Sequence, residues 1–146
     1  MKITKKYSHF AGEEYLIVHH KQLYDEVIAL IDTIDYSSSN STKVEEIFGS
    51  KNWNKKNHNR KEFIKDQIVL AIHLEGNFNN SFDVISSHLL RYYYDEIKLG
   101  IEIFPTKQMK TQMTPDNVSF EEQVHTISIK DRSNLPVPLL ILGIEP

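Results

Sequence analysis

The sequence predicts an α/β fold in which helices pack against a partly parallel β-sheet. Two apolar runs, residues 68–74 and 98–104, are rich in the aliphatic and β-branched residues of buried strands. Between them, residues 81–97 carry apolar side chains at helical spacing, with Ser81 as a candidate N-cap. A strand, a helix and a second strand in this order form a crossover, which favours parallel pairing of the two strands.

Length and composition limit the classes of protein that the chain can form. With 146 residues and no internal repeat, residues 1–146 are expected to form a single domain, and 40% hydrophobic and 25% charged residues are ordinary for a globular protein. The sequence has no apolar run long enough to span a membrane and no signal-peptide pattern, so we expect a cytoplasmic protein with no membrane partner. The absence of cysteine excludes disulfides and thiolate zinc sites. A net charge of -3 argues against extensive coating of nucleic acid but allows a local basic groove.

The other elements are expected on both sides of this central unit. Residues 13–20 fit a strand or a helix equally, whereas Ser119 and Glu122 match a capping box at the start of a helix. Apolar spacing, breaks and prolines predict an edge strand over residues 2–7, helices over residues 21–34, 42–48, 107–113 and 119–129, and a final strand over residues 139–144.

Strand alternation divides residues 68–75 between two faces of the sheet. Ile68, Leu70, Ile72 and Leu74 point one way, and Val69, Ala71, His73 and Glu75 point the other way. Glu62 approaches the strand on the side of His73 and Glu75. A hydrolytic metal site is expected on that face if the chain has one.

A basic stretch precedes this strand. Residues 50–61 contain five basic side chains, one tryptophan and no acid. The favoured interpretation is a solvated loop with Trp53 in the core, and the alternative is a clamp on DNA phosphates. The candidate DNA-binding residues are Lys51, Lys55, Lys56, Arg60, Lys61, Lys65, Lys107 and Lys110. The consecutive tyrosines 92–94 offer a base-stacking surface, but packing of at least one ring in the core is favoured.

Five blocks together carry a resemblance that runs nearly end to end: YSHFAGEEYLIVH, the helix ending in IDY, EFIKDQIVLAIHLEGN, LGIEIFPTKQM and VPLLILGIEP. In this order they resemble the BglII/BstYI family of type II restriction endonucleases. The resemblance implies a restriction-endonuclease-like PD-(D/E)XK core with a central mixed β-sheet flanked by helices. It also implies a homodimer that hydrolyses DNA with Mg²⁺. The interval between the first long helix and Glu62, which contributes to DNA recognition in that family, is short here.

The family's active site is an Asp, a Glu nine residues later and a Gln two residues further. By resemblance these positions fall on Glu62, Ala71 and His73, so the chain departs from the pattern at each of them. Glu62 can bind Mg²⁺ through oxygen, but Ala71 cannot. Glu75 is a second candidate metal ligand, although a strand rise of about 3.3 Å per residue puts it roughly 13 Å from Ala71. His73 suits a general base at neutral pH, but a histidine filling a vacated polar pocket is favoured.

Three functional hypotheses follow. The first is a DNA-interacting protein with a degenerate, catalytically impaired metal site, acting as a DNA-binding or nuclease-partner regulatory protein. The second is an active Mg²⁺-dependent endodeoxyribonuclease with a rearranged site, in which Glu62 and His73 are catalytic, with Glu75 or Asp83 in support. The third is a protein interaction module without DNA binding.

Overall fold

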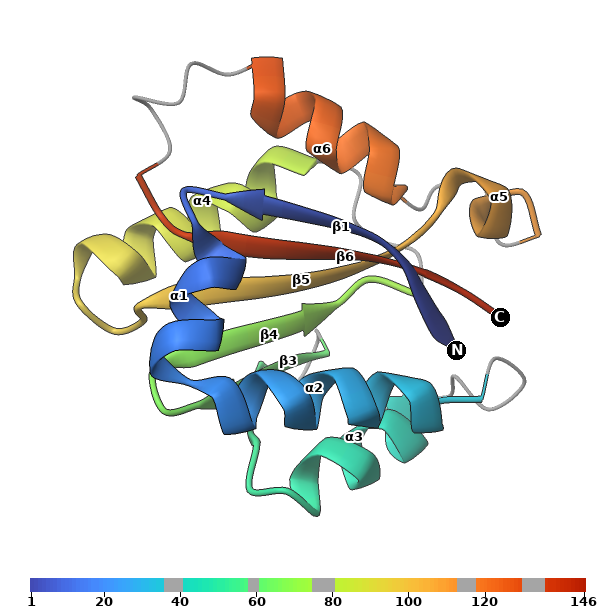
Figure 1. Cartoon of the computed structure of the whole chain (residues 1–146), viewed down its shortest axis with the longest axis horizontal. Helices are drawn as coiled ribbons and strands as arrows, with labels where there is room; N and C mark the ends of the chain where they lie inside the picture. Colours follow the sequence, from blue (N-terminus) through green and yellow to red (C-terminus); the bar gives the residue numbers. More distant parts are fainter. Residues whose placement is uncertain (36–40, 58–60, 75–80, 113–117, 130–135) are drawn as a thin grey trace.

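A computed structural model describes residues 1–35, 41–57, 61–74, 81–112, 118–129 and 136–146. They form a mixed β-sheet with helices on both faces (Figure 1). The strands are β1 (Lys2–His9), β2 (Asn54–Asn57), β3 (Glu62–Lys65), β4 (Ile68–Ile72), β5 (Leu99–Pro105) and β6 (Leu139–Glu145). The helices are α1 (Gly12–His19), α2 (Lys21–Thr33), α3 (Ser41–Gly49), α4 (Ser81–Tyr93), α5 (Lys107–Lys110) and α6 (Phe120–Ile129). Within the described ranges, no helix has the length and apolar character needed to cross a membrane.

The sheet combines a parallel centre with antiparallel edges. The six strands lie in the order β1-β6-β5-β4-β3-β2. Strands β4, β5 and β6 are parallel, whereas β1, β3 and β2 each pair antiparallel with their inner neighbour. The expected β4-α4-β5 crossover and the mixed sheet are therefore confirmed.

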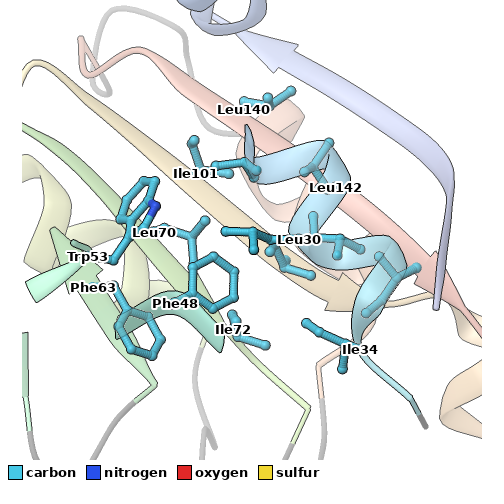
Figure 2. Close-up of a cluster of buried hydrophobic side chains, with 14 of the residues drawn as sticks. Leu30, Ile34, Phe48, Trp53, Phe63, Leu70, Ile72, Ile101, Leu140 and Leu142 are labelled. Atoms are coloured by element: carbon cyan, nitrogen blue, oxygen red, sulfur yellow. The ribbon is translucent and has the colours of Figure 1, made fainter. Parts of the chain in front are cut away.

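One face of the sheet, called the apolar face here, carries Ile68, Leu70 and Ile72 of β4 and packs against α2 and α3 (Figure 2). Phe48 of α3 is fully buried, with its ring centroid 5.1 Å from that of Phe63. Burial of such apolar surface is the main term that stabilises the fold.

Trp53 belongs to the core of this face, as expected. Its side chain is 3% exposed, and its ring meets Phe48 edge-on at 6.0 Å between centroids. The indole N–H donates to a Glu26 carboxylate oxygen at 2.8 Å. A buried tryptophan needs such an acceptor, because its only polar group is otherwise unsatisfied.

The opposite face, called the polar face here, lies under α4 and α6 (Figure 1). Its apolar part is a small cluster in which Phe104, Phe120 and Ile141 pack together. Gly100 of β5 also faces this side. A Cβ atom at Gly100 would lie 3.3 Å from His88 Nδ1 and 2.8 Å from the Leu139 side chain, so glycine allows α4 to approach the sheet.

The hairpin between β3 and β4 was not predicted from the sequence. Strand β3 pairs antiparallel with β4 through Asp66 and Gln67, whose φ angles are 50° and 61°. Two consecutive positive φ angles match a tight hairpin turn, which normally carries asparagine and glycine. Because Asp66-Gln67 lacks glycine, the usual signal of this turn is missing.

Other boundaries differ from the expected ones. The stretch expected as a loop contains the edge strand β2, whose lysines are the kind of charged residue that protects a sheet edge from further pairing. Helix α4 ends at Tyr93 rather than Ile97, and Asp95 follows with a φ of 57°. Residues 12–19 are helical. The capping box of α6 is confirmed, since Ser119 Oγ accepts from the Glu122 N–H at 3.3 Å and Glu122 Oε2 accepts from the Ser119 N–H at 2.8 Å.

Candidate functional site

Three residues form a row across the polar face. The antiparallel register pairs Glu62 with Ala71, and the parallel register pairs Ala71 with Glu102. Residues that are directly paired across strands point to the same side of a sheet, and neighbouring strands lie about 4.8 Å apart. The row therefore places one glutamate on each side of the Ala71 methyl group, with the two glutamate Cα atoms roughly 10 Å apart.

Both glutamates are buried. Glu62 is 4% exposed and Glu102 is 1% exposed. A buried carboxylate is costly unless a positive or hydrogen-bonding group faces it. The side chains that cover the row therefore decide what the site can do.

Helix α4 supplies two of these side chains. His88 and Arg91 lie three residues apart, so they share one face of the helix. Arg91 Nη1 donates to Glu62 Oε1, and His88 Nε2 contacts Glu102 Oε1. Each carboxylate of the row thus faces one basic group of the same helix.

His73 supplies the third side chain. It follows β4, its N–H donates to the Ile103 carbonyl at 2.9 Å, and it is 5% exposed. Its ring stacks on Phe104 with centroids 4.3 Å apart and planes 13° apart. Its Nε2 hydrogen-bonds Glu102 Oε2. Glu102 therefore joins two imidazoles, one on each carboxylate oxygen.

The surroundings of Glu102 keep it ionised. Burial alone would raise the pKa of this carboxyl, but the charges of His88 and His73 and their hydrogen bonds outweigh burial and lower the pKa to about 2. At neutral pH, Glu102 is therefore a carboxylate enclosed by its own partners.

The described residues do not fit a Mg²⁺ site. Mg²⁺ requires oxygen ligands in near-octahedral geometry and usually at least one or two carboxylates. Glu62 is held by Arg91, Ala71 offers no ligand, and Glu102 is enclosed by two histidines. In the part of the chain that the structure describes, no group of three or more His, Asp or Glu side chains is arranged to hold a metal ion. Glu75 and the side chain of Asp83 lie outside the described residues.

The lysines expected to bind DNA are dispersed rather than gathered at this row. Lys65 pairs with Ile68 at the far end of the hairpin, roughly 10 Å along the strand from Glu62. Its ammonium group donates to Glu26 at 2.8 Å and to the Lys51 carbonyl at 2.8 Å. Lys55 donates to Glu45 at 2.5 Å.

The remaining candidate DNA contacts differ in exposure. Lys56 is exposed, Lys61 is 8% exposed, and Arg60 lies outside the described residues. On α5, Lys107 is exposed and Lys110 forms an ion pair with Glu122 at 2.8 Å. Several of these side chains are thus engaged within the protein.

The family model for the restriction endonucleases BglII and BglIII matches residues 4–144. The chain belongs to this family. A crystal structure of free BglII superposes with a TM-score of 0.75 at 15% sequence identity, over 100% of this chain and 80% of that one. At that identity the likeness shows the fold, and it confirms the restriction-endonuclease-like α/β core. No curated protein sequence matches the chain significantly.

Within this family member, sequence reasoning missed Glu102 and Arg91 and assigned no role to His88. One signal was present for Glu102, because a glutamate inside the apolar run LGIEIF is rarely buried without a partner. Nothing local links Glu62 to Arg91, which lies 29 residues further along the chain. Of the tyrosines, Tyr92 packs against the small cluster of the polar face, whereas Tyr93 and Tyr94 are 81% and 68% exposed.

Proposed function

We propose that this restriction-endonuclease-like chain binds DNA but does not cleave it by the Mg²⁺-dependent reaction of its family. One observation carries the proposal: the row that would hold a metal has Ala71 at its centre and a basic side chain of the protein on each flanking carboxylate. The family supports DNA as the partner, and the composition of the row supports the loss of cleavage.

The energetics of the Glu62–Arg91 pair oppose metal binding. The Glu62 side chain is 5% exposed and that of Arg91 is 23% exposed. A metal ion that bound Glu62 would have to displace this guanidinium, and it would gain no oxygen ligand from Ala71.

A plasmid assay tests the cleavage half of the proposal. Supercoiled DNA is incubated with the purified protein and Mg²⁺ or Mn²⁺, and nicked and linear products are measured. We expect no product above the level given by Glu62→Ala. Metal-dependent cleavage that disappears in Glu62→Ala would overturn the proposal.

Retention of a DNA duplex by the purified protein in EDTA tests the DNA-binding half of the proposal. Binding through phosphate contacts weakens steeply as salt rises, so the logarithm of affinity should fall linearly with the logarithm of salt concentration. Absence of salt-sensitive retention would instead support a protein interaction module. We also propose that the chain forms a homodimer, and light scattering on the same sample measures this. Pull-down with an active family member tests a nuclease-partner role.

An active nuclease with a rearranged site is the second candidate function. One observation favours it: Glu102 brings a carboxylate into the same row, one strand beyond Ala71, and is hydrogen-bonded to His73. On this hypothesis the plasmid is cleaved, and Glu62→Ala, Glu102→Ala and His73→Ala each abolish cleavage. The plasmid assay therefore separates the two candidates directly.

A further inference from the structure

We infer that Arg91 is a phosphate anchor, which contacts a DNA phosphate at the position where a metal-dependent nuclease holds its cation. The inference rests on the proposed DNA binding and assigns it a residue. Arg91 is the only arginine within the described ranges, because Arg60 and Arg132 lie outside them. Its guanidinium is bound to the carboxylate that the family pattern would assign to the metal.

The exposure of the row differs between its two ends. The His88 and Glu102 side chains are 4% and 1% exposed, so solutes do not reach this pair. The Arg91 side chain is 23% exposed while its partner Glu62 is 5% exposed. Arg91 is therefore the basic residue of the row that solvent reaches, and Glu62 is its buried partner.

Arg91 retains the capacity to bind an anion while it holds Glu62. A guanidinium has five N–H donors, and Nη1 donates to Glu62. Among the described residues, Glu62 is the only hydrogen-bonding or ion-pair partner of the Arg91 side chain. Guanidinium groups bind phosphate through two parallel N–H donors, which suits the donors that remain.

Ala71 favours the approach of a phosphate to this group. A carboxylate at that position would repel a phosphate unless a cation lay between them. The methyl group of Ala71 adds no negative charge, and the charge of Glu62 is compensated by Arg91. Glu62 is thus a positioning residue that orients the guanidinium, and no metal ion is required for this contact.

Fluorescence anisotropy with a labelled short duplex in EDTA tests the inference. Arg91→Ala should weaken binding about tenfold, the loss expected of one charge-assisted contact, and should reduce the salt slope by about one. Arg91→Lys should retain part of the affinity, because it keeps the charge without the planar fork. Lys21→Ala, which removes an exposed charge paired with Asp25 on α2, is the matched control and should bind as the wild type does.

Glu62→Gln separates an anchor from a merely structural ion pair. If the pair only supports the fold, Arg91→Ala and Glu62→Gln should lose similar affinity, and that result overturns the inference. If Arg91 binds phosphate, Glu62→Gln should bind DNA at least as tightly as the wild type. The double variant Glu62→Ala/Arg91→Ala leaves no buried charge without a partner, so it should fold and still show the tenfold loss.

The outcomes also separate this inference from the proposed function. A wild-type protein that binds no duplex refutes the proposed DNA binding and the anchor with it. Wild-type binding that Arg91→Ala leaves unchanged refutes the anchor alone. If Mg²⁺ strengthens DNA binding by the wild type but not by Glu62→Gln, the position belongs to a metal ion. That result overturns the inference.

Discussion

The two faces of the central sheet are built from the same strands but are stabilised by different interactions. On the apolar face, Ile68, Leu70 and Ile72 of β4 meet the helices α2 and α3 in a continuous hydrocarbon core. On the polar face lie Ala71 of β4, His73 just after that strand and Glu102 of β5, and α4 covers them with His88 and Arg91. One face is stabilised by burial of apolar area, and the other requires each buried charge to meet a partner.

This difference shows which face carries side chains that stability does not require. Replacing a buried ion pair with packed apolar residues is often neutral or stabilising, so charge networks are not needed for stability as such. A fold that only had to be stable could carry aliphatic residues on both faces of its parallel strands, as buried parallel sheets commonly do. The charged row on the polar face is therefore the feature that stability alone does not explain.

The largest expected effect on stability is on the apolar face. Phe48→Ala should lower the free energy of unfolding by about 3–5 kcal/mol, because it removes a fully buried ring that contacts Phe63 and Trp53 and leaves a cavity. Urea denaturation measures the change. DNA affinity of the folded fraction should stay at the wild-type level, and Phe10→Ala, at a ring that is 55% exposed, should change stability by less than about 0.5 kcal/mol. A loss of DNA affinity in folded Phe48→Ala would contradict the separation of the two faces.

On the polar face, Glu102→Gln should lower the free energy of unfolding by a smaller amount, about 3 kcal/mol. The variant leaves His73 and His88 without their carboxylate. The pKa of Glu102 is lowered to about 2 in the folded protein from an ordinary 4.5. Its ionisation therefore stabilises the fold fully above pH 4.5, and this contribution is lost as the pH falls from 4.5 towards 2.

Denaturation of both proteins across this pH range measures the contribution. The difference in free energy of unfolding between the wild type and Glu102→Gln should narrow as the pH falls below 4.5. Asp25→Asn, which removes a carboxylate whose side chain is 58% exposed, is the control and should change little. A difference that stays constant down to acid pH would show that Glu102 gains no stability from its ionised form.

The smallest effect is expected at the start of α6, the second helix of the polar face. Ser119→Ala removes the hydroxyl that accepts from the Glu122 N–H, and it should cost about 1 kcal/mol. Thermal unfolding measures this change, with Ser128→Ala, near the exposed end of the same helix, as the control. Equal losses in the two variants would mean that the capping box does not stabilise α6.

Much of the fold was predictable because its signals are local. The apolar run ending at Leu74 and the run IEIF before Pro105 identified β4 and β5, and the residues between them identified α4. Alternation along β4 also placed Ala71 and His73 on one face, as the structure has them. The hairpin of β3 and β4 was missed because Asp66-Gln67 lacks glycine, and β2 was missed because its polar residues are typical of a loop.

The amino-acid sequence by itself determined the β4-α4-β5 unit, the division of β4 between two faces, and the presence of alanine where the family pattern has a carboxylate. Only the tertiary structure decided that Glu102 joins the row and that α4 places Arg91 on Glu62. Strand register and the rotation of a helix over a sheet arise from the packing of segments that are distant in the chain. No local spacing records such contacts, so the partners of each buried charge became apparent only once the chain was folded.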